Sequence, residues 1–178
     1  MNTTNRWVRF LLIAGYIAML VGALDPMEGS LLIIPGSGLV ALGAYLGYEE
    51  RWIVIYRVLL FFLILIGVTA LWVLTVQGGF GGDSGRSIWW GLLFVPYLVS
   101  WSMGIWGPDS PRWVLWSGIG VGLWYQVILV MTLKMPANFD QTVEARIFVG
   151  FIAVIGVLTI IGCIYRLRKR SSSKVRLT

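Results

Sequence analysis

The sequence predicts an all-α protein, a polytopic membrane bundle of six transmembrane helices. The chain has 178 residues, of which 58% are hydrophobic and only 12% charged. Soluble domains carry about 25% charged residues, so an apolar excess of this size indicates contact with lipid. The apolar residues form six runs separated by short links, and each run is about long enough to cross a hydrocarbon core. We expect one domain in which neighbouring helices lie antiparallel.

The first apolar run follows Arg6 and Arg9 and resembles a secretory signal. A second run comes almost at once, so we interpret the first as an uncleaved span. Because the bilayer core offers no water to the backbone, each run must satisfy its own hydrogen bonds as a helix. The expected spans are 7–24, 31–48, 52–76, 88–106, 113–133 and 147–165, followed by a basic tail over 166–178.

The start of the second span has the features of a helix cap. Asp25 suits the N-cap position, Pro26 the first helical position and Glu28 the third position of a capping box. Pro35 then removes a backbone hydrogen bond inside the helix, and Gly36 follows it. We therefore expect the second helix to be kinked or broken near residues 34–38.

The same segment has an alternative interpretation as a ligand or ion site. Interrupted helices with nearby carboxylates and hydroxyls form such sites in several transporters. The candidate residues are Asp25, Glu28, Ser30 and Ser37. Along a continuous helix, positions 28 and 37 are about 13 Å apart, so this site requires the chain to fold back at the break.

Two further spans carry residues that affect their expected shape or depth. Arg57 lies just inside the third span, and its long side chain is expected to reach back to the interface. Pairing with Glu49 or Glu50 is an open alternative. Pro96 is expected to kink the fourth span.

Small residues predict where helices approach one another closely, because they bring the two backbones together. Gln126 lies near the middle of the fifth span, where its amide should bond to another helix. Cys163, in the sixth span, is expected to be a small packing residue. The helix-packing candidates are Gly43, Gly47, Gly118, Gly122 and Gln126.

Basic residues give the expected orientation. With the N-terminus inside, eleven Lys and Arg residues lie on the cytoplasmic side and three on the other. This positive-inside bias predicts that both termini are cytoplasmic in a multi-pass protein of the plasma or inner membrane. Most tryptophans fall at span ends, as expected for an interfacial belt, whereas Trp124 is deep.

The composition excludes several kinds of chemistry. The chain has no histidine and one cysteine, which removes His-dependent catalysis, the commonest zinc and haem ligand, and any internal disulfide. Beyond Asp25 and Glu28, no acid–base pair is evident. We expect no catalytic residue, metal or cofactor, and the sequence has no nucleic-acid module.

These observations favour a non-enzymatic integral membrane protein. It would be an accessory or scaffolding subunit, or a homo-oligomer that packs through small-residue helix faces. The alternative is a small transporter or channel with its site at the interrupted second helix, at Asp25, Glu28 and Ser37. The expected partners are the lipid bilayer, anionic lipid headgroups at the basic tail, and other membrane subunits or a second copy of the chain.

Overall fold

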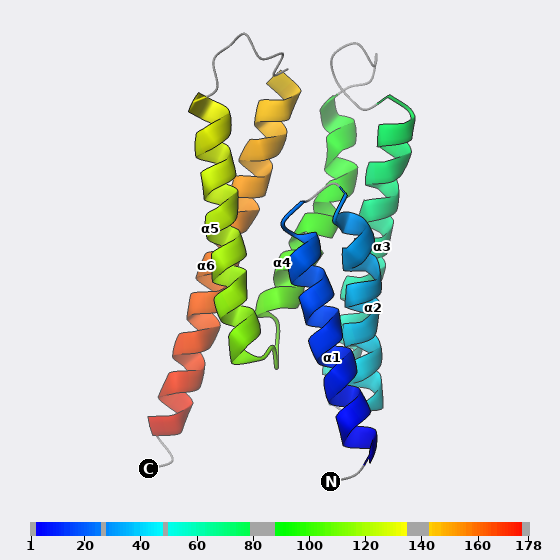
Figure 1. The fold of residues 1–178 in the computed structure, drawn as a ribbon, viewed down its shortest axis with the longest axis vertical. Coiled ribbons are helices and arrows are strands. Elements are labelled where there is room, and N and C mark those ends of the chain that lie inside the picture. The colour runs from blue at the N-terminus through cyan, green and yellow to red at the C-terminus, as the bar shows by residue number, and fades with distance from the viewer. Residues whose placement is uncertain (1–2, 26–27, 48–49, 79–87, 135–142, 176–178) are drawn as a thin grey trace. The chain divides into compact units, whose positions relative to one another are not determined.

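The chain is all-helical throughout the part that the computed structural model describes, residues 3–25, 28–47, 50–78, 88–134 and 143–175. No strand occurs among these residues, so the predicted all-α class is confirmed for them. The helices are α1 (Thr3–Gly22), α2 (Ser30–Leu46), α3 (Arg51–Val76), the 3-10 helix η2 (Ile88–Phe94), α4 (Val95–Trp106), α5 (Arg112–Lys134) and α6 (Val143–Val175) (Figure 1). The links predicted at 77–87 and 134–146 fall largely outside the described residues.

Within the described residues, three helices are long and apolar enough to cross a membrane. They are α3, α5 and the Val149–Ser171 part of α6. Two further apolar helices are shorter, Ser30–Leu46 and Trp90–Trp106. At 1.5 Å per residue, a helix of 17 residues such as α2 covers about 26 Å, slightly less than a typical hydrocarbon core.

The second helix was predicted to be kinked or broken near residues 34–38, and of these two alternatives the break is wrong. Helix α2 runs without interruption from Ser30 to Leu46, with Pro35 inside it. Proline leaves the carbonyl four residues earlier, on Leu31, without its helical donor. The helix is nevertheless continuous because one side of it is packed against neighbouring helices, with Ile33 fully buried and Val40 nearly so. Packing here outweighs the local cost of proline.

The fourth expected span is divided at its proline. Residues 88–94 form the 3-10 helix η2, and the α-helical part begins at Val95, directly before Pro96. In α4 the proline occupies the second position, so its missing N–H falls in the first turn of the α-helical part, where proline is best tolerated. The change of helix type thus falls where the sequence predicts a kink.

The last helix extends beyond the expected end of its span. Helix α6 continues through residue 165 to Val175, so the start of the basic tail is helical. Lys and Arg are good helix formers, and their polarity ends the apolar run without ending the helix. Tyr165, the last residue of the apolar run, is followed directly by Arg166.

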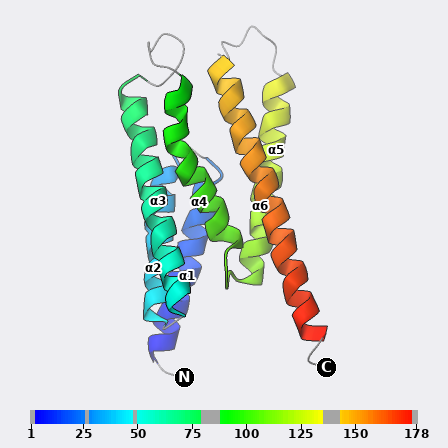
Figure 2. The same cartoon turned by 180° about the vertical axis from the view of Figure 1, so that it is seen from behind.

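The helices form two compact units. The first comprises Met1–Trp72 and Leu93–Gly104, and the second comprises Val73–Leu92 and Ile105–Thr178. In the first unit, α1 and α2 lie side by side and antiparallel (Figure 1). In the second unit, α5 and α6 form the corresponding close pair, which Figure 2 shows from behind.

The α1–α2 pair is held together through glycines. Gly15 on α1 faces Gly36 on α2, and a β-carbon at Gly15 would lie 2.7 Å from the Gly36 carbonyl oxygen. Gly22 faces Gly29 in the same way at the turn. Without side chains at these positions the two backbones can touch, which maximises van der Waals contact between the helices.

Candidate functional site

The turn before α2 contains the two carboxylates of the predicted site. The backbone N–H of Glu28 donates to the Asp25 carboxylate, with 3.2 Å between the atoms. The Gly29 N–H donates to the Asp25 carbonyl oxygen at 2.9 Å. Both acidic side chains are exposed. Asp25 therefore stabilises the turn before the helix. The predicted N-cap position is wrong, because α2 begins at Ser30 and its N-cap residue is Gly29, which makes no side-chain capping bond.

Ser30 is completely buried at the first position of α2. Its hydroxyl oxygen accepts a hydrogen bond of 3.1 Å from the indole N–H of Trp72, on α3. A partly buried indole N–H still needs an acceptor, so this contact links the start of α2 to α3. Ser30 thus acts as a contact between two helices.

Ser37 lies deeper in the same helix and is also buried. Its hydroxyl donates to the carbonyl oxygen of Ile34 in its own helix at 2.9 Å. Because α2 is continuous from Ser30, Ser37 lies about 10 Å along the helix axis from the start of the helix, and Glu28 lies in the turn before that start. The structure therefore brings Asp25 and Glu28 together in one turn but does not bring Ser37 to them.

Arg57 is a buried charge of the first unit, and contacts within the chain hold its side chain. Its side chain is only 5% exposed. One guanidinium nitrogen donates to the Gly104 carbonyl oxygen at 2.9 Å, and the guanidinium lies 5.5 Å from the centre of the Tyr16 ring. Of the two alternative acidic partners, Glu49 lies outside the described residues.

The Gly104 carbonyl can accept a bond from Arg57 because it lies in the last turn of α4. The last carbonyl groups of a helix have no donor within the helix, and the helix dipole makes that end negative. Tyr56 donates to the Met103 carbonyl oxygen at 2.9 Å, so two consecutive α3 residues bind consecutive carbonyls in the last turn of α4. The Arg57 guanidinium and the Tyr56 hydroxyl thus supply hydrogen-bond donors to two carbonyl groups at the C-terminal end of α4.

The predicted packing glycines all lie against helices of their own chain. A β-carbon at Gly43 would meet the Leu12 side chain, and one at Gly47 would lie 3.2 Å from Val8. In the second unit, a β-carbon at Gly118 would lie 3.0 Å from the sulfur of Cys163, and one at Gly122 would lie 2.7 Å from the Gly156 carbonyl oxygen. Cys163 is fully buried in this contact.

Gln126 joins the two helices of the second unit. Its amide nitrogen donates to the Ala153 carbonyl oxygen on α6 at 2.8 Å, and it lies 3.4 Å from the Gly122 carbonyl oxygen on its own helix. A polar amide in an apolar helix needs such a partner. Its position is that of an interhelical contact.

Glycine recurs every seven residues through α1 and α2, a pattern that the predicted packing positions do not include. Glycine occupies positions 15, 22, 29, 36 and 43. Seven residues correspond to nearly two helical turns, so these positions share one face of each helix. The signal was present in the sequence, but the repeat is divided between two helices, because α1 ends at Gly22 and α2 begins at Ser30.

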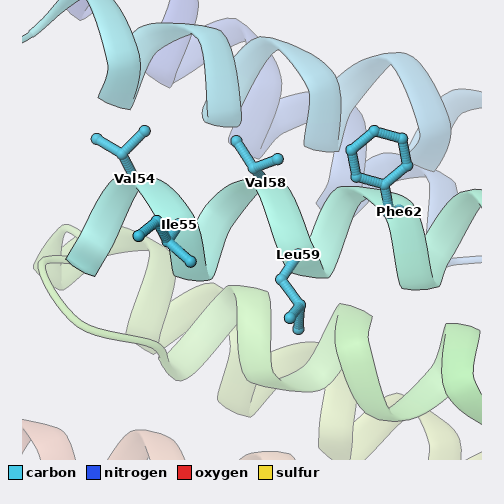
Figure 3. A pocket seen from close by; sticks show the side chains of 5 residues that line it. All are labelled: Val54, Ile55, Val58, Leu59 and Phe62. Atoms are coloured by element: carbon cyan, nitrogen blue, oxygen red, sulfur yellow. The ribbon is translucent and has the colours of Figure 1, made fainter. Parts of the chain in front are cut away.

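The surface hollow shown in Figure 3 is apolar. It measures about 400 Å³ and is lined by α3 side chains, Val54, Ile55, Val58, Leu59 and Phe62. These residues offer no donor, acceptor or titratable group. Within the described residues, no group of three or more His, Cys, Asp or Glu side chains could hold a metal ion. The hollow therefore presents an apolar surface on α3.

Comparison with known proteins gives no relative: no protein-family model, curated protein or solved structure matches the chain.

Proposed function

We propose that the chain is a non-enzymatic integral membrane protein that serves as a subunit of a membrane assembly. It crosses the plasma or inner membrane six times, with both termini in the cytoplasm. The positive-inside bias of its basic residues supports this orientation. The three long apolar helices support its place in a membrane.

The observation that carries the proposal is the use of polar side chains between helices. Trp72 bonds to Ser30, Arg57 to Gly104 and Gln126 to Ala153. Each of these bonds joins one helix to another, so groups that could act on a ligand instead hold the fold together. Helices fixed to one another in this way present a constant outer surface, and a scaffolding subunit needs such a surface to bind its partners.

The surface available for a partner differs from the one that the glycine pattern suggested. The glycines at 43, 47, 118 and 122 contact helices of the same chain. By contrast, a β-carbon at Gly120 would have no atom within 4 Å. Trp116 and Trp124 flank it at four-residue spacing on α5 and are 64% and 43% exposed. We call these three residues the α5 stripe.

The α5 stripe fits a neighbouring helix. Residues four apart share a helix face, so the two rings stand on either side of the glycine. A glycine lets a second backbone approach, and the flanking rings extend the contact. Trp124 lies near the middle of α5, away from the interfacial depth that indole rings prefer, and a helix packed on it removes its ring from lipid.

Site-directed cross-linking tests the proposal. In a Cys163→Ala background the chain has no other cysteine, and Gly120→Cys then places one thiol in the α5 stripe. The matched control is Val154→Cys, a 58% exposed position on α6. We expect membranes treated with a mild oxidant or a bifunctional thiol reagent to give adducts at position 120 and none at position 154.

The adduct identifies the kind of assembly. A dimer of the chain at position 120 supports a homo-oligomer, and an adduct with a protein that also co-purifies in mild detergent supports a subunit of a mixed complex. A monomer that yields no adduct at position 120 and elutes alone contradicts the proposal.

A further inference from the structure

A basic cleft lies in the second unit between the loop after α4 and the last turns of α6. It measures about 220 Å³ and is lined by Pro108, Asp109, Arg166, Lys169 and Arg170. Three cationic side chains face one carboxylate there, so the cleft carries an excess of positive charge. Such a cleft attracts an anion.

The three cations are arranged to act together. They occupy positions i, i+3 and i+4 on α6, which lie on one face of the helix. Arg166 is also held in place, because its Nε donates to the Trp106 carbonyl oxygen at 3.1 Å. A guanidinium fixed through Nε keeps its terminal NH₂ groups in a defined plane, the geometry that binds phosphate through two parallel hydrogen bonds.

The opposite wall is formed by the loop between α4 and α5. Pro108 is buried, and Asp109 has a φ of 57°, a left-handed conformation that Asp tolerates better than most residues. The wall therefore has a defined backbone shape. Ser110, next to it, is completely buried.

The depth of the cleft indicates which anion it meets. The apolar run of α6 ends at Tyr165, directly before the first cleft arginine. A β-carbon at Gly162, one turn earlier, would lie 2.7 Å from the Trp106 ring, and Trp113 at the start of α5 is 39% exposed. Tryptophan side chains mark the depth of the lipid headgroups. The cleft opens at that level.

We propose that this cleft binds the phosphate group of an anionic phospholipid, whose acyl chains lie along the apolar surface of the second unit. Basic pockets between helices at the cytoplasmic side are suited to such headgroups. The proposal rests on the membrane placement and orientation proposed above but not on the assembly, since it concerns one chain and its lipid.

The test measures lipid binding to the whole chain in mild detergent. Dioleoyl phosphatidylglycerol is the anionic probe, and dioleoyl phosphatidylcholine, with the same acyl chains, is the zwitterionic control. We expect phosphatidylglycerol to bind at least tenfold more tightly, with one molecule retained per chain in native mass spectrometry. Equal affinity for the two lipids overturns the proposal.

Variants separate the cleft from the general charge of the tail. Lys169→Gln and Arg170→Gln each remove one charge from the cleft, whereas Arg168→Gln removes one charge from an exposed residue of α6 that does not line it. We expect a loss of at least fivefold in phosphatidylglycerol affinity for the first two variants and less than twofold for the third. Equal losses in all three variants mean diffuse attraction and contradict a defined site. Thermal unfolding checks that each variant is folded.

Soluble anions distinguish the source of the phosphate. Inorganic phosphate and glycerol 3-phosphate at millimolar concentration should not displace phosphatidylglycerol, because they lack the acyl chains. If either displaces it from the chain but loses this effect with Arg170→Gln, the cleft serves a soluble phosphate and the lipid assignment is wrong.

Discussion

At the residue scale, the Asp25 carboxylate accepts a backbone hydrogen bond from Glu28 at the turn before α2. This contact gives a direct way to separate a turn-stabilising residue from an ion or proton site. Asparagine accepts the same bond as well as aspartate does, but it carries no charge and no titratable proton. The two functions therefore respond differently to one substitution.

We expect Asp25→Asn to change stability by no more than a few tenths of a kcal/mol, and Asp25→Ala to lower it by about 1 kcal/mol. The measurement is reversible unfolding in mixed detergent micelles. For the transporter alternative, Asp25→Asn with Glu28→Gln is assayed for solute flux in liposomes. An unchanged background flux removes these acids from a transport mechanism, whereas loss of a measurable flux restores the alternative.

Arg57 gives a second prediction at this scale. Its guanidinium both bonds to the Gly104 carbonyl oxygen and lies over the Tyr16 ring. A lysine ammonium is a compact point charge without a planar face, so it cannot make both contacts in the same way. Arg57→Lys should lower the free energy of unfolding by about 1–2 kcal/mol, close to the worth of one charged hydrogen bond.

The matched control for Arg57 is Arg51→Lys. Arg51 begins the same helix and is exposed. Its replacement should change stability by less than about 0.5 kcal/mol, as is usual for surface positions. Equal effects of the two substitutions in the same unfolding assay would show that the buried contacts of Arg57 contribute nothing specific.

At the scale of elements, the glycine contacts determine how closely α1 and α2 pack. A β-carbon at Gly36 would lie 2.9 Å from the Gly15 carbonyl oxygen and 3.0 Å from the Ala18 β-carbon. Both atoms belong to the opposite helix, and one is backbone, so the helices must separate to admit even a methyl group. We expect Gly36→Ala to cost about 1–3 kcal/mol.

Gly150→Ala is the control for this substitution. It lies in α6, and a β-carbon there would have no atom within 4 Å. Alanine is the better helix former by up to about 1 kcal/mol, so this variant should be neutral or slightly more stable. If unfolding shows the same loss for both variants, close α1–α2 packing is not what Gly36 provides.

The helix positions themselves follow well from the sequence, for a physical reason. A backbone without water must form helix along the whole apolar run, so the third and fifth runs nearly coincide with their helices. The third run was expected at 52–76, and α3 spans Arg51–Val76. The fifth was expected at 113–133, and α5 spans Arg112–Lys134.

The exceptions arise where contacts outside the segment decide. Pro35 alone predicts a break, but the glycine contacts and buried face of α2 keep the helix continuous. Arg57 near the end of an apolar run predicts snorkelling, because the sequence does not show that the end of α4 offers it a carbonyl. Likewise, the hydroxyls of Ser30 and Ser37 suggest a ligand site in the sequence, because the sequence does not show that they bond to Trp72 and to the Ile34 carbonyl.

At the scale of the whole molecule, the number of crossings is the feature with the largest consequence. In the part of the chain that the structure describes, three helices are long and apolar enough to span a membrane, whereas α2 and the Trp90–Trp106 segment are shorter. Whether the segment that contains η2 and α4 crosses the membrane can be tested directly. If this segment crosses the membrane, the residues before it and after it lie on opposite sides.

Cysteine accessibility decides between these arrangements. In the Cys163→Ala background, Ser84→Cys precedes η2 in sequence, and Asp109→Cys follows α4 at an exposed position. In intact cells, a membrane-impermeant maleimide should label position 84 from outside and should reach position 109 only after the membrane is opened. The proposed orientation requires this result, because Arg112 and the basic tail favour the cytoplasm.

Labelling of both positions from the same side would mean that η2 and α4 do not cross, and would remove the six-span arrangement. Labelling of position 109 alone from outside would retain the crossing but reverse the orientation.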